Sequence, residues 1–455
     1  MKHSLNKQVK KRFSLRPMMV VFLGFLVVMF VGAFFLALPI SNTDGQWMGF
    51  THAVFWAMNG VCGTGLVVTP TALSFTGFGQ GVLLLLIQFG GLGFMTIATF
   101  VFIIIRKRIT LKDRIAIQEA LGQDQIKGVV RLVRNIIIMT LIIEVAGMGL
   151  LTPFFCVKNG AIGVWQALFT SVSAFCNAGF DILGRVGNEY GSLTDYNGNY
   201  GIITIVALIA ILGSFGFPVI DDILKCRFRY KRYRFHTKAV LIVSLSIMTF
   251  GTLFFLASEF NSPATAGMNG GEKLLNSMFQ SVTASSTAGY SSLDQTKLSG
   301  AGAVLSTVIM FIGSSPCSTG GGIKTTTFAV LVLMGWSGLR GKDEITVGMR
   351  SISFKTGLRA IAVLMLGSAL IITGVSIIGA TDGISPVGYI LYDTVSAFTT
   401  TGLSMGIVPG LSNAALYVLA VVMFIGRLGP LSIGLMFSKQ DHSGLKFPPA
   451  NIMIG

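Results

Sequence analysis

Four short stretches of the chain end in the same pattern: a small residue, a glycine and a large apolar residue. The shared glycines are Gly65, Gly179, Gly289 and Gly402, at intervals of 114, 110 and 113 residues. The stretches read Val61-Cys62-Gly63-Thr64-Gly65-Leu66, Phe175-Cys176-Asn177-Ala178-Gly179-Phe180, Ser285-Ser286-Thr287-Ala288-Gly289-Tyr290 and Phe398-Thr399-Thr400-Thr401-Gly402-Leu403. Such regular spacing indicates one structural unit that occurs four times in one polypeptide.

The chemistry open to these stretches is the binding of a dehydrated cation. A cation gives up its hydration shell only where other oxygen atoms replace it, as four loops of backbone carbonyls do in potassium channels. Glycine reaches positive φ cheaply and so lets successive carbonyls face one axis. Glycine and small residues also allow close helix packing in membranes, but close packing does not require four copies at matched spacing. We therefore predict a selectivity filter that binds K⁺ through the backbone carbonyls of residues 61–65, 175–179, 285–289 and 399–402.

The composition predicts a polytopic membrane protein. Of 455 residues, 52% are hydrophobic and 11% are charged, whereas about a quarter of a soluble protein is charged. The net charge of +16 would suggest nucleic acid in a soluble protein. The densest basic run, at 225–238, instead lies between two predicted crossings, which favours contact with lipid headgroups or a partner subunit over nucleic acid.

Each repeat predicts a spanning helix, a short helix, the glycine stretch and a second spanning helix. The short helices have about 11 residues, or roughly 16 Å, which is half of the hydrocarbon thickness. Such a re-entrant segment must be buried or line a watery cavity. The predicted fold is all-α, with eight transmembrane helices in four tandem pore units around a pseudo-four-fold axis. The pore units cover residues 18–105, 135–220, 239–339 and 360–437.

The distribution of basic residues predicts the orientation in the membrane. The tails and the linkers between units hold 28 of the 34 Lys and Arg residues. Because basic residues accumulate on the cytoplasmic side, we expect both termini in the cytoplasm and all four glycine stretches to enter from outside. These cytoplasmic segments are 1–17, 106–134, 221–238, 340–359 and 438–455.

The sequence predicts a break in the returning helix of the third unit and in no other returning helix. Three glycines and a proline interrupt the apolar pattern after Phe311, and these residues cannot continue a helix cheaply. A simple kink is one interpretation; a movable gate across the pore is the other. A charge in the membrane is a functional hypothesis by default, so the gate prediction includes the two basic residues at this depth, although a structural anchor is the alternative for Arg427. The predicted gate residues are Gly313, Ser314, Ser315, Pro316, Gly320, Gly321, Gly322, Lys324 and Arg427.

These features together resemble the superfamily of potassium transporters that contains the Trk, Ktr and plant HKT proteins. Within it, the chain is most similar to the ion-translocating, KtrB-type subunits of bacterial Ktr systems. The resemblance implies K⁺ uptake across the bacterial cytoplasmic membrane, with Na⁺ as a coupling or activating ion. It also implies a homodimer and a cytoplasmic KtrA-type ring that binds nucleotides. HKT relatives that transport sodium carry serine at the first filter glycine, so Gly65 favours potassium.

Three alternatives are open. Each copy keeps one shared glycine and therefore fewer ordered carbonyls than a potassium channel, so a sodium-permeable or weakly selective transporter is possible. Proton-linked uptake of the Trk type is another alternative. An enzyme is disfavoured, because the membrane-depth ionisable residues Glu144, Lys324 and Arg427 are scattered along the chain rather than clustered. The five cysteines show no metal-ligand spacing, and we expect no organic cofactor.

Overall fold

A computed structural model of the chain describes residues 17–93, 96, 129–184, 186–341, 344–347, 350–383 and 386–429. This part is helical apart from a hairpin of two antiparallel strands, β1 (Ile345–Val347) and β2 (Arg350–Ile352). The predicted C-terminal tail, nearly all of the N-terminal tail and most of the linker at 106–134 lie outside the described residues, as do the ends of the first and fourth returning helices.

The helices follow one another in the expected order of long, short and returning helix. The first unit contains α1 (Pro17–Ala37), α2 (Phe50–Cys62) and α4 (Gly77–Leu92), with the short α3 (Thr71–Ser74) between the last two. The second contains α7 (Val129–Asn159), α8 (Ile162–Phe175), α9 (Tyr200–Ser214) and α10 (Phe217–Lys225). The third contains α11 (Phe235–Glu259), α12 (Gly270–Ser286), α13 (Gly300–Ile312) and α14 (Thr325–Leu339). The fourth contains α15 (Phe354–Asp382), α16 (Val387–Thr399) and α17 (Asn413–Leu428).

The described helices include few that could cross a membrane unaided. Three are long and apolar enough, namely Val130–Asn159, Phe235–Glu259 and Phe354–Asp382. The pair α9 and α10 would make a fourth if taken together, but they meet at 97°. The remaining apolar helices have 10 to 17 residues each. Eight crossings therefore stay a prediction.

The bend between α9 and α10 corrects one expectation. The sequence predicts a break in the third returning helix alone, but the second returning helix also turns sharply, at Phe215 and Gly216. Gly216 has a φ of 82°, which a glycine adopts without the cost that a Cβ would bring. The loop after α13 packs against this bend, since Phe217 donates its N–H to the carbonyl of Cys317 at 3.1 Å.

In the second and third units, the long helix packs on its own short helix through a glycine. Gly147 of α7 lies against the Ser171 hydroxyl of α8, and Gly251 of α11 lies against the Ser281 hydroxyl of α12. Each serine also donates across the contact, Ser171 to the carbonyl of Glu144 at 2.7 Å and Ser281 to the carbonyl of Met248 at 2.8 Å. Small residues let membrane helices approach closely, and hydroxyls then bond across them. This contact places equivalent residues of two units in register.

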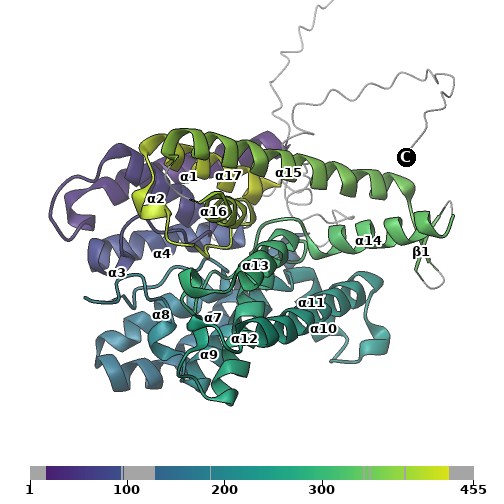
Figure 1. Ribbon diagram of the computed structural model, residues 1–455, viewed down its shortest axis with the longest axis horizontal. Helices are drawn as coiled ribbons and strands as arrows, with labels where there is room; N and C mark the ends of the chain where they lie inside the picture. Colours follow the sequence, from purple (N-terminus) through teal and green to yellow (C-terminus); the bar gives the residue numbers. More distant parts are fainter. Residues whose placement is uncertain are drawn as a thin grey trace, which may run out of the picture.

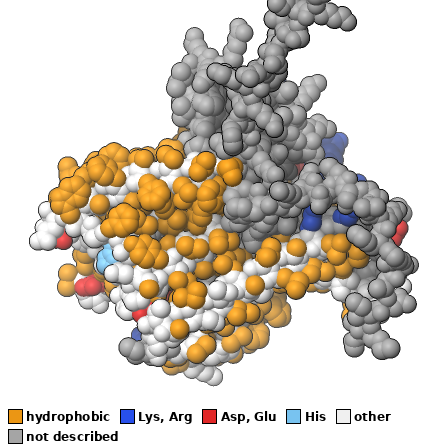
Figure 2. Space-filling view, turned by 90° about the horizontal axis from the view of Figure 1, so that it is seen from above, with side chains coloured by type: hydrophobic (Ala, Val, Ile, Leu, Met, Phe, Trp, Pro, Cys, Tyr) orange, Lys and Arg blue, Asp and Glu red, His pale blue; other side chains and the backbone are white. Residues whose placement is uncertain are grey.

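The interior and the exterior are both apolar, as a membrane protein requires. The aromatic residues ten positions before each filter glycine, Phe55, Phe169, Phe279 and Tyr392, are fully buried. Large hydrophobic side chains also lie on the outside of the long helices, and Figure 2 shows hydrophobic side chains spread over the described part of one face. In Figure 1, α14 and α15 extend side by side away from the other helices toward the hairpin.

In two units, a carboxylate at the end of the long helix bonds the serine at the start of the returning helix. We call this contact the carboxylate–serine staple. In the third unit, the buried Glu259 carboxylate accepts from the N–H and the hydroxyl of Ser299, which caps α13. In the fourth unit, Asp382 accepts in the same way from Ser412, which caps α17. Asp382 is only half-buried.

We predict that Glu259→Ala destabilises the protein more than Asp382→Ala. Hydrogen bonds to a charged group contribute about 1.5–3 kcal/mol each, and a buried N–H left without a partner adds a further penalty. Thermal unfolding of the detergent-solubilised variants measures this. An equal or larger drop in Tm for Asp382→Ala would show that burial does not set the strength of the staple.

Candidate functional site

The four glycine stretches meet in a closed ring of backbone contacts. A Cβ built on Gly179 would lie 2.9 Å from the α-carbon of Gly289, and 3.0 Å from the carbonyl oxygen of Ala288. The other three glycines lie even closer to the neighbouring stretch, because a Cβ built on each would overlap a carbonyl oxygen. The overlaps are Gly65 with Ala178, Gly289 with Thr401, and Gly402 with Thr64. The ring therefore runs from the first stretch through the second, third and fourth and back to the first.

The backbone of each stretch takes the same unusual course. The filter glycines have φ values of 89°, 68°, 76° and 92°. Two residues earlier, Gly63, Asn177, Thr287 and Thr400 also have positive φ, between 50° and 63°. Side chains at such positions cost roughly 1–2 kcal/mol each, and strain of this kind concentrates at functional sites. The repeated pattern therefore reflects a geometry that the site requires.

A second repeated contact holds each stretch to its short helix. The residue before the filter glycine donates its N–H to the carbonyl five residues earlier, at 2.9–3.0 Å, in all four copies. This is the helix-ending arrangement in which a left-handed residue follows the last turn. The C-terminal ends of α2, α8, α12 and α16 consequently lie at the ring, and each such end carries a partial negative charge that favours a cation.

Polar residues six positions before each glycine brace three of the stretches. Asn59 accepts from the N–H of Gly65 at 2.8 Å, and Ser396 accepts from the N–H of Gly402 at 2.9 Å. Ser173 donates to the carbonyl of Phe180 at 2.8 Å. The sequence reasoning missed these residues, although a polar residue at the same offset in all four copies was available as a signal.

The returning helices abut the first residue of three stretches. A Cβ on Gly90, Gly213 or Gly426 would overlap the carbonyl oxygen of Val61, Phe175 or Phe398, respectively. In the third unit, Gly313 lies instead against the carbonyl of Gly321, which belongs to the loop between α13 and α14. The loop thus replaces a contact that the other three units make with their glycine stretches.

A cavity of about 950 Å³ opens on one side of the ring. All four filter glycines line it, together with residues that follow them in sequence. Its described acidic residues are Asp181, Glu189, Asp195 and Asp294, against the single described basic residue Lys297. A cleft lined by one sign of charge concentrates the opposite ion. This cavity can therefore gather cations at the ring.

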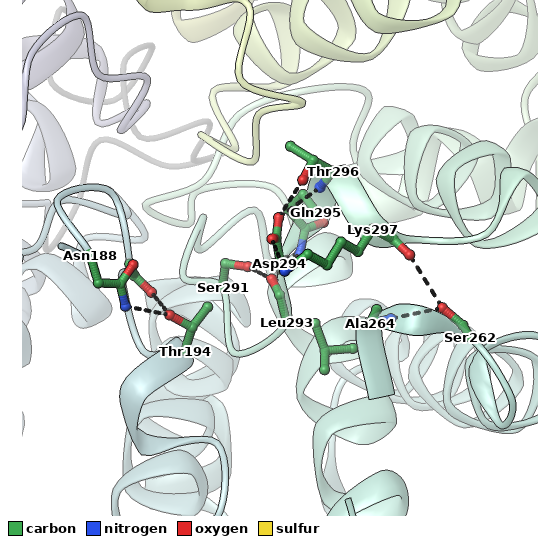
Figure 3. A network of polar contacts seen from close by, with 11 residues as sticks. Asn188, Thr194, Ser262, Ala264, Ser291, Leu293, Asp294, Gln295, Thr296 and Lys297 are labelled. Atoms are coloured by element: carbon green, nitrogen blue, oxygen red, sulfur yellow. Dashed lines mark hydrogen bonds and ion pairs between the residues drawn. The ribbon is translucent and has the colours of Figure 1, made fainter. Parts of the chain in front are cut away.

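Hydrogen bonds fix the wall of the cavity. Asp294 accepts from the N–H of Thr296 at 3.1 Å and from its hydroxyl at 2.6 Å, and it pairs with Lys297 at 3.1 Å. Partial burial works against ionisation, but these hydrogen bonds outweigh it and lower the pKa of Asp294 from its usual value. Figure 3 shows the same wall, with the carbonyl of Lys297 accepting from Ser262. The carboxylate therefore stays charged near neutral pH.

The loop 313–324 packs against the other side of the ring. It contacts residues that precede the filter glycines, whereas the cavity is lined by the glycines and the residues after them. A Cβ on Gly320 would overlap the hydroxyl of Thr287, and one on Gly321 would overlap that of Thr400. Only glycine allows the loop to approach the ring this closely.

Side chains of the third and fourth units hold the loop in place, partly through backbone carbonyls of the first and second units. Thr319 donates its hydroxyl to the carbonyl of Phe175 at 3.0 Å and its N–H to the carbonyl of Gly213 at 3.3 Å. Arg427 of α17 donates to the carbonyls of Thr319 and Gly90. Lys324 donates to the carbonyl of Gly320 at 2.7 Å. Both predicted gate cations thus bind backbone oxygens at the break.

The remaining predicted gate residues form the start of the same loop. Ser315 donates its N–H to the carbonyl of Ser214 at 3.1 Å, and Ser314 accepts from the N–H of Thr325 at 3.2 Å. The carbonyl of Pro316 lies against Gly216 at the bend after α9. The sequence prediction omitted Thr319, because a threonine between Ser318 and Gly320 gives no signal without the carbonyls that it contacts.

The family model of TrkH, described as a cation transport protein, matches residues 7–446. The chain belongs to the TrkH family. Among curated members, it is 36% identical to the Ktr system potassium uptake protein B of Bacillus subtilis, over 98% of this chain and 99% of that protein. It is 34% identical to the potassium/sodium uptake protein NtpJ of Enterococcus hirae, over 99% of each.

The fold is that of TrkH as well. The crystal structure of the potassium transporter TrkH from Vibrio parahaemolyticus matches with a TM-score of 0.73, at 18% identity, over 96% of this chain and 87% of that chain. This TrkH-family chain is therefore a helical membrane protein related to ion transporters, as the resemblance in its repeats predicts.

We predict that Gly402→Ala destabilises the protein far more than Gly406→Ala. Both glycines have positive φ, at 92° and 83°, so either substitution carries a backbone cost of roughly 1–2 kcal/mol. Only at Gly402 would the new Cβ overlap a carbonyl oxygen of the ring. A Cβ on Gly406 would lie 3.6 Å from its nearest neighbour, a methyl carbon of Thr296. Thermal unfolding in detergent compares the two, and equal drops in Tm would contradict a close-packed ring.

Proposed function

We propose that this protein takes up K⁺ across the bacterial cytoplasmic membrane, through one pore formed by its four repeats. The observation that carries the proposal is the closed ring of four glycine stretches between an acidic cavity and a loop. Its relatives are named as potassium uptake proteins. The positive-inside distribution supports a multi-pass orientation with the cavity outside and both termini in the cytoplasm.

In this mechanism the ring acts as the selectivity filter. Cations gather in the acidic cavity and exchange water for the backbone carbonyls of the four stretches. The negative ends of the four short helices favour the bound ion. Hydroxyls of Thr64, Ser286, Thr287 and Thr400 are buried without a hydrogen-bond partner in the described part of the chain, and those of Thr287 and Thr400 lie against the loop 313–324.

The loop 313–324 acts as the gate in this proposal. It lies against the filter residues Thr287, Thr399 and Thr400, where it would obstruct an ion leaving the ring. Arg427 and Lys324 hold its carbonyls and place positive charge below the filter. Opening would require these bonds to break and the loop to move away from the ring.

The names of the relatives extend the proposal to Na⁺ and to partners. One relative is named a potassium/sodium uptake protein, which supports Na⁺ as a coupling or activating ion. Two others are named as components of Ktr systems, which supports a regulatory partner of the KtrA type that binds nucleotides. We further propose a homodimer in the lipid bilayer, with one pore in each protomer.

The main rival is a sodium-permeable or weakly selective transporter with the same architecture. The potassium/sodium name of one relative favours it specifically. Expression in a bacterium that lacks its own K⁺ uptake tests both functions. Growth at low K⁺ is expected, with a dependence on Na⁺ and on a KtrA-type partner. Equal initial rates of K⁺ and Na⁺ uptake would favour the rival, and no rescue of growth would contradict K⁺ uptake.

We expect Gly289→Ser to lower the affinity for K⁺ or the preference for K⁺ over Na⁺. The residue has a φ of 76°, and its Cβ would overlap the carbonyl of Thr401 in the next stretch, so the carbonyls of the ring must shift. Uptake of ⁸⁶Rb⁺ and ²²Na⁺ in cells with matched expression measures both quantities. Unchanged kinetics for both ions would refute the filter assignment.

Removal of one glycine from Gly320–Gly322 should raise the flux of ions. A shorter loop cannot reach its contacts with the filter residues Thr287 and Thr400, so the obstruction is lost. Deletion of Gly267 is the control, because a Cβ built on this loop glycine would meet no atom within 4 Å. Wild-type or lower flux in the loop variant, at normal expression, would argue against a gate.

A further inference from the structure

A buried carboxylate in α7 is connected to the second glycine stretch by two hydrogen bonds. Glu144 is 4% exposed and accepts from the side-chain N–H of Gln88 of α4 at 3.2 Å. Gln88 in turn accepts from the thiol of Cys176 at 3.6 Å. Cys176 belongs to the stretch that ends at Gly179, so the chain of contacts runs from a long helix of the second unit through the first unit to the ring.

The carboxylate is only partly satisfied by these contacts. Its second oxygen, Oε1, has no hydrogen-bond partner among the described residues. A charged or polar group in the membrane interior is costly and is retained mainly where it has a function. The question is whether the fold itself needs Glu144.

The repeats answer this question, because they place three other residues at the same position. In each unit, one glycine of the long helix lies against an apolar residue of the returning helix: Gly32 against Leu86, Gly147 against Ile209, Gly251 against Ile309 and Gly374 against Val422. The residue three positions earlier is Met29, Glu144, Met248 or Ile371. The three apolar residues are 2%, 7% and 5% exposed, so the other units bury a hydrophobic side chain where the second unit buries a carboxylate.

Gln88 is likewise a polar residue at a position where the other three units have an apolar one. It lies two residues before Gly90, the glycine that abuts the first residue of its filter stretch. Two residues before the corresponding Gly213 and Gly426 stand Ile211 and Phe424, and Phe311 precedes Gly313 by the same distance. The fold is therefore built three times without polar residues at either position, and the Glu144–Gln88 pair is not required for packing.

We propose that Glu144 is a positioning residue for the filter, which holds the second glycine stretch through Gln88 and Cys176 and contributes to the preference for K⁺ over Na⁺. This inference rests on the proposed function. A carboxylate at the end of a chain of hydrogen bonds polarises the bonds before it and strengthens them. It therefore fixes the side chain of Cys176 more firmly than a hydrophobic neighbour would.

The position of Cys176 affects two neighbouring elements, α4 and the loop 313–324. A Cβ on Gly91 would lie 2.5 Å from the Cys176 sulfur, so α4 packs directly on this residue. The next residue, Asn177, has a φ of 50° and its amide lies 2.8 Å from the hydroxyl of Thr319 in the loop 313–324. A displacement of Cys176 would therefore alter both the second filter stretch and its contact with the loop.

The test exchanges each polar residue for its counterpart in another unit. We would measure K⁺ and Na⁺ uptake in cells, and thermal unfolding in detergent, for Glu144→Met, Gln88→Ile and the double variant. Ile371→Met is the matched control at the equivalent position. Glu144→Gln keeps an oxygen that can accept from Gln88 but removes the ionisable carboxyl, so it separates the hydrogen bond from any effect of ionisation.

We expect Glu144→Met and Gln88→Ile each to raise the KM for K⁺ at least threefold and to lower the K⁺ to Na⁺ ratio similarly. Maximal rate should stay within twofold, and the Tm should be unchanged or higher. Because both act through one chain of contacts, the double variant should be no worse than the stronger single variant. Glu144→Gln should fall between Glu144→Met and the parent, and Ile371→Met should behave like the parent.

A KM and an ion ratio within twofold of the parent for Glu144→Met would overturn the inference, as would a lower Tm that accounts for reduced uptake. Gly289→Ser separates this outcome from failure of the proposed function. If the parent takes up K⁺ and Gly289→Ser alters that uptake while Glu144→Met does not, the positioning role alone is wrong. If the parent takes up no K⁺, the proposed function fails and the inference fails with it.

Discussion

The structure of this protein depends first on the close contact between four glycine backbones. Each of Gly65, Gly179, Gly289 and Gly402 lies so near the next stretch that a single added carbon would strike its backbone. Because the contacts close into a ring, no stretch can move without displacing its neighbours. The positive φ angles, the helix-ending hydrogen bonds and the polar braces all serve this geometry, since each fixes one stretch relative to its own short helix.

The membrane adds a second constraint, which the structure meets at the breaks in its helices. Backbone groups outside a helix need partners when no water is present. At the break after α13, a serine hydroxyl, two basic side chains and backbone groups of the second unit supply them. Arg427 donates to the loop carbonyl of Thr319, and Lys324 donates to that of Gly320. The same residues that satisfy the backbone thus place positive charge next to the ring, so one arrangement serves both stability and the proposed gate.

Departures from four-fold symmetry are confined to particular units, and this is what makes them informative. The ring itself is nearly symmetric in its backbone. The third unit replaces a helix-to-filter contact with a loop, the fourth supplies an arginine, and the second carries Glu144 where the others are apolar. For each such feature, the three units that lack it show what the fold requires. The one unit that has it shows a residue or loop that the fold does not require. Such a comparison separates function from packing without reference to any other protein.

The sequence alone determined the family and the helical class, and it located the four stretches and the interrupted third helix. It could do so because periodicity, glycine spacing and charge asymmetry are local properties of the chain. The tertiary structure decided which groups meet: the order of the ring, the placement of the loop against Thr287 and Thr400, and the bend at Gly216, which the sequence prediction missed. The Glu144–Gln88–Cys176 contacts also required it, since these residues lie 56 and 88 positions apart. Contacts between distant segments depend on packing in three dimensions, which no local pattern encodes.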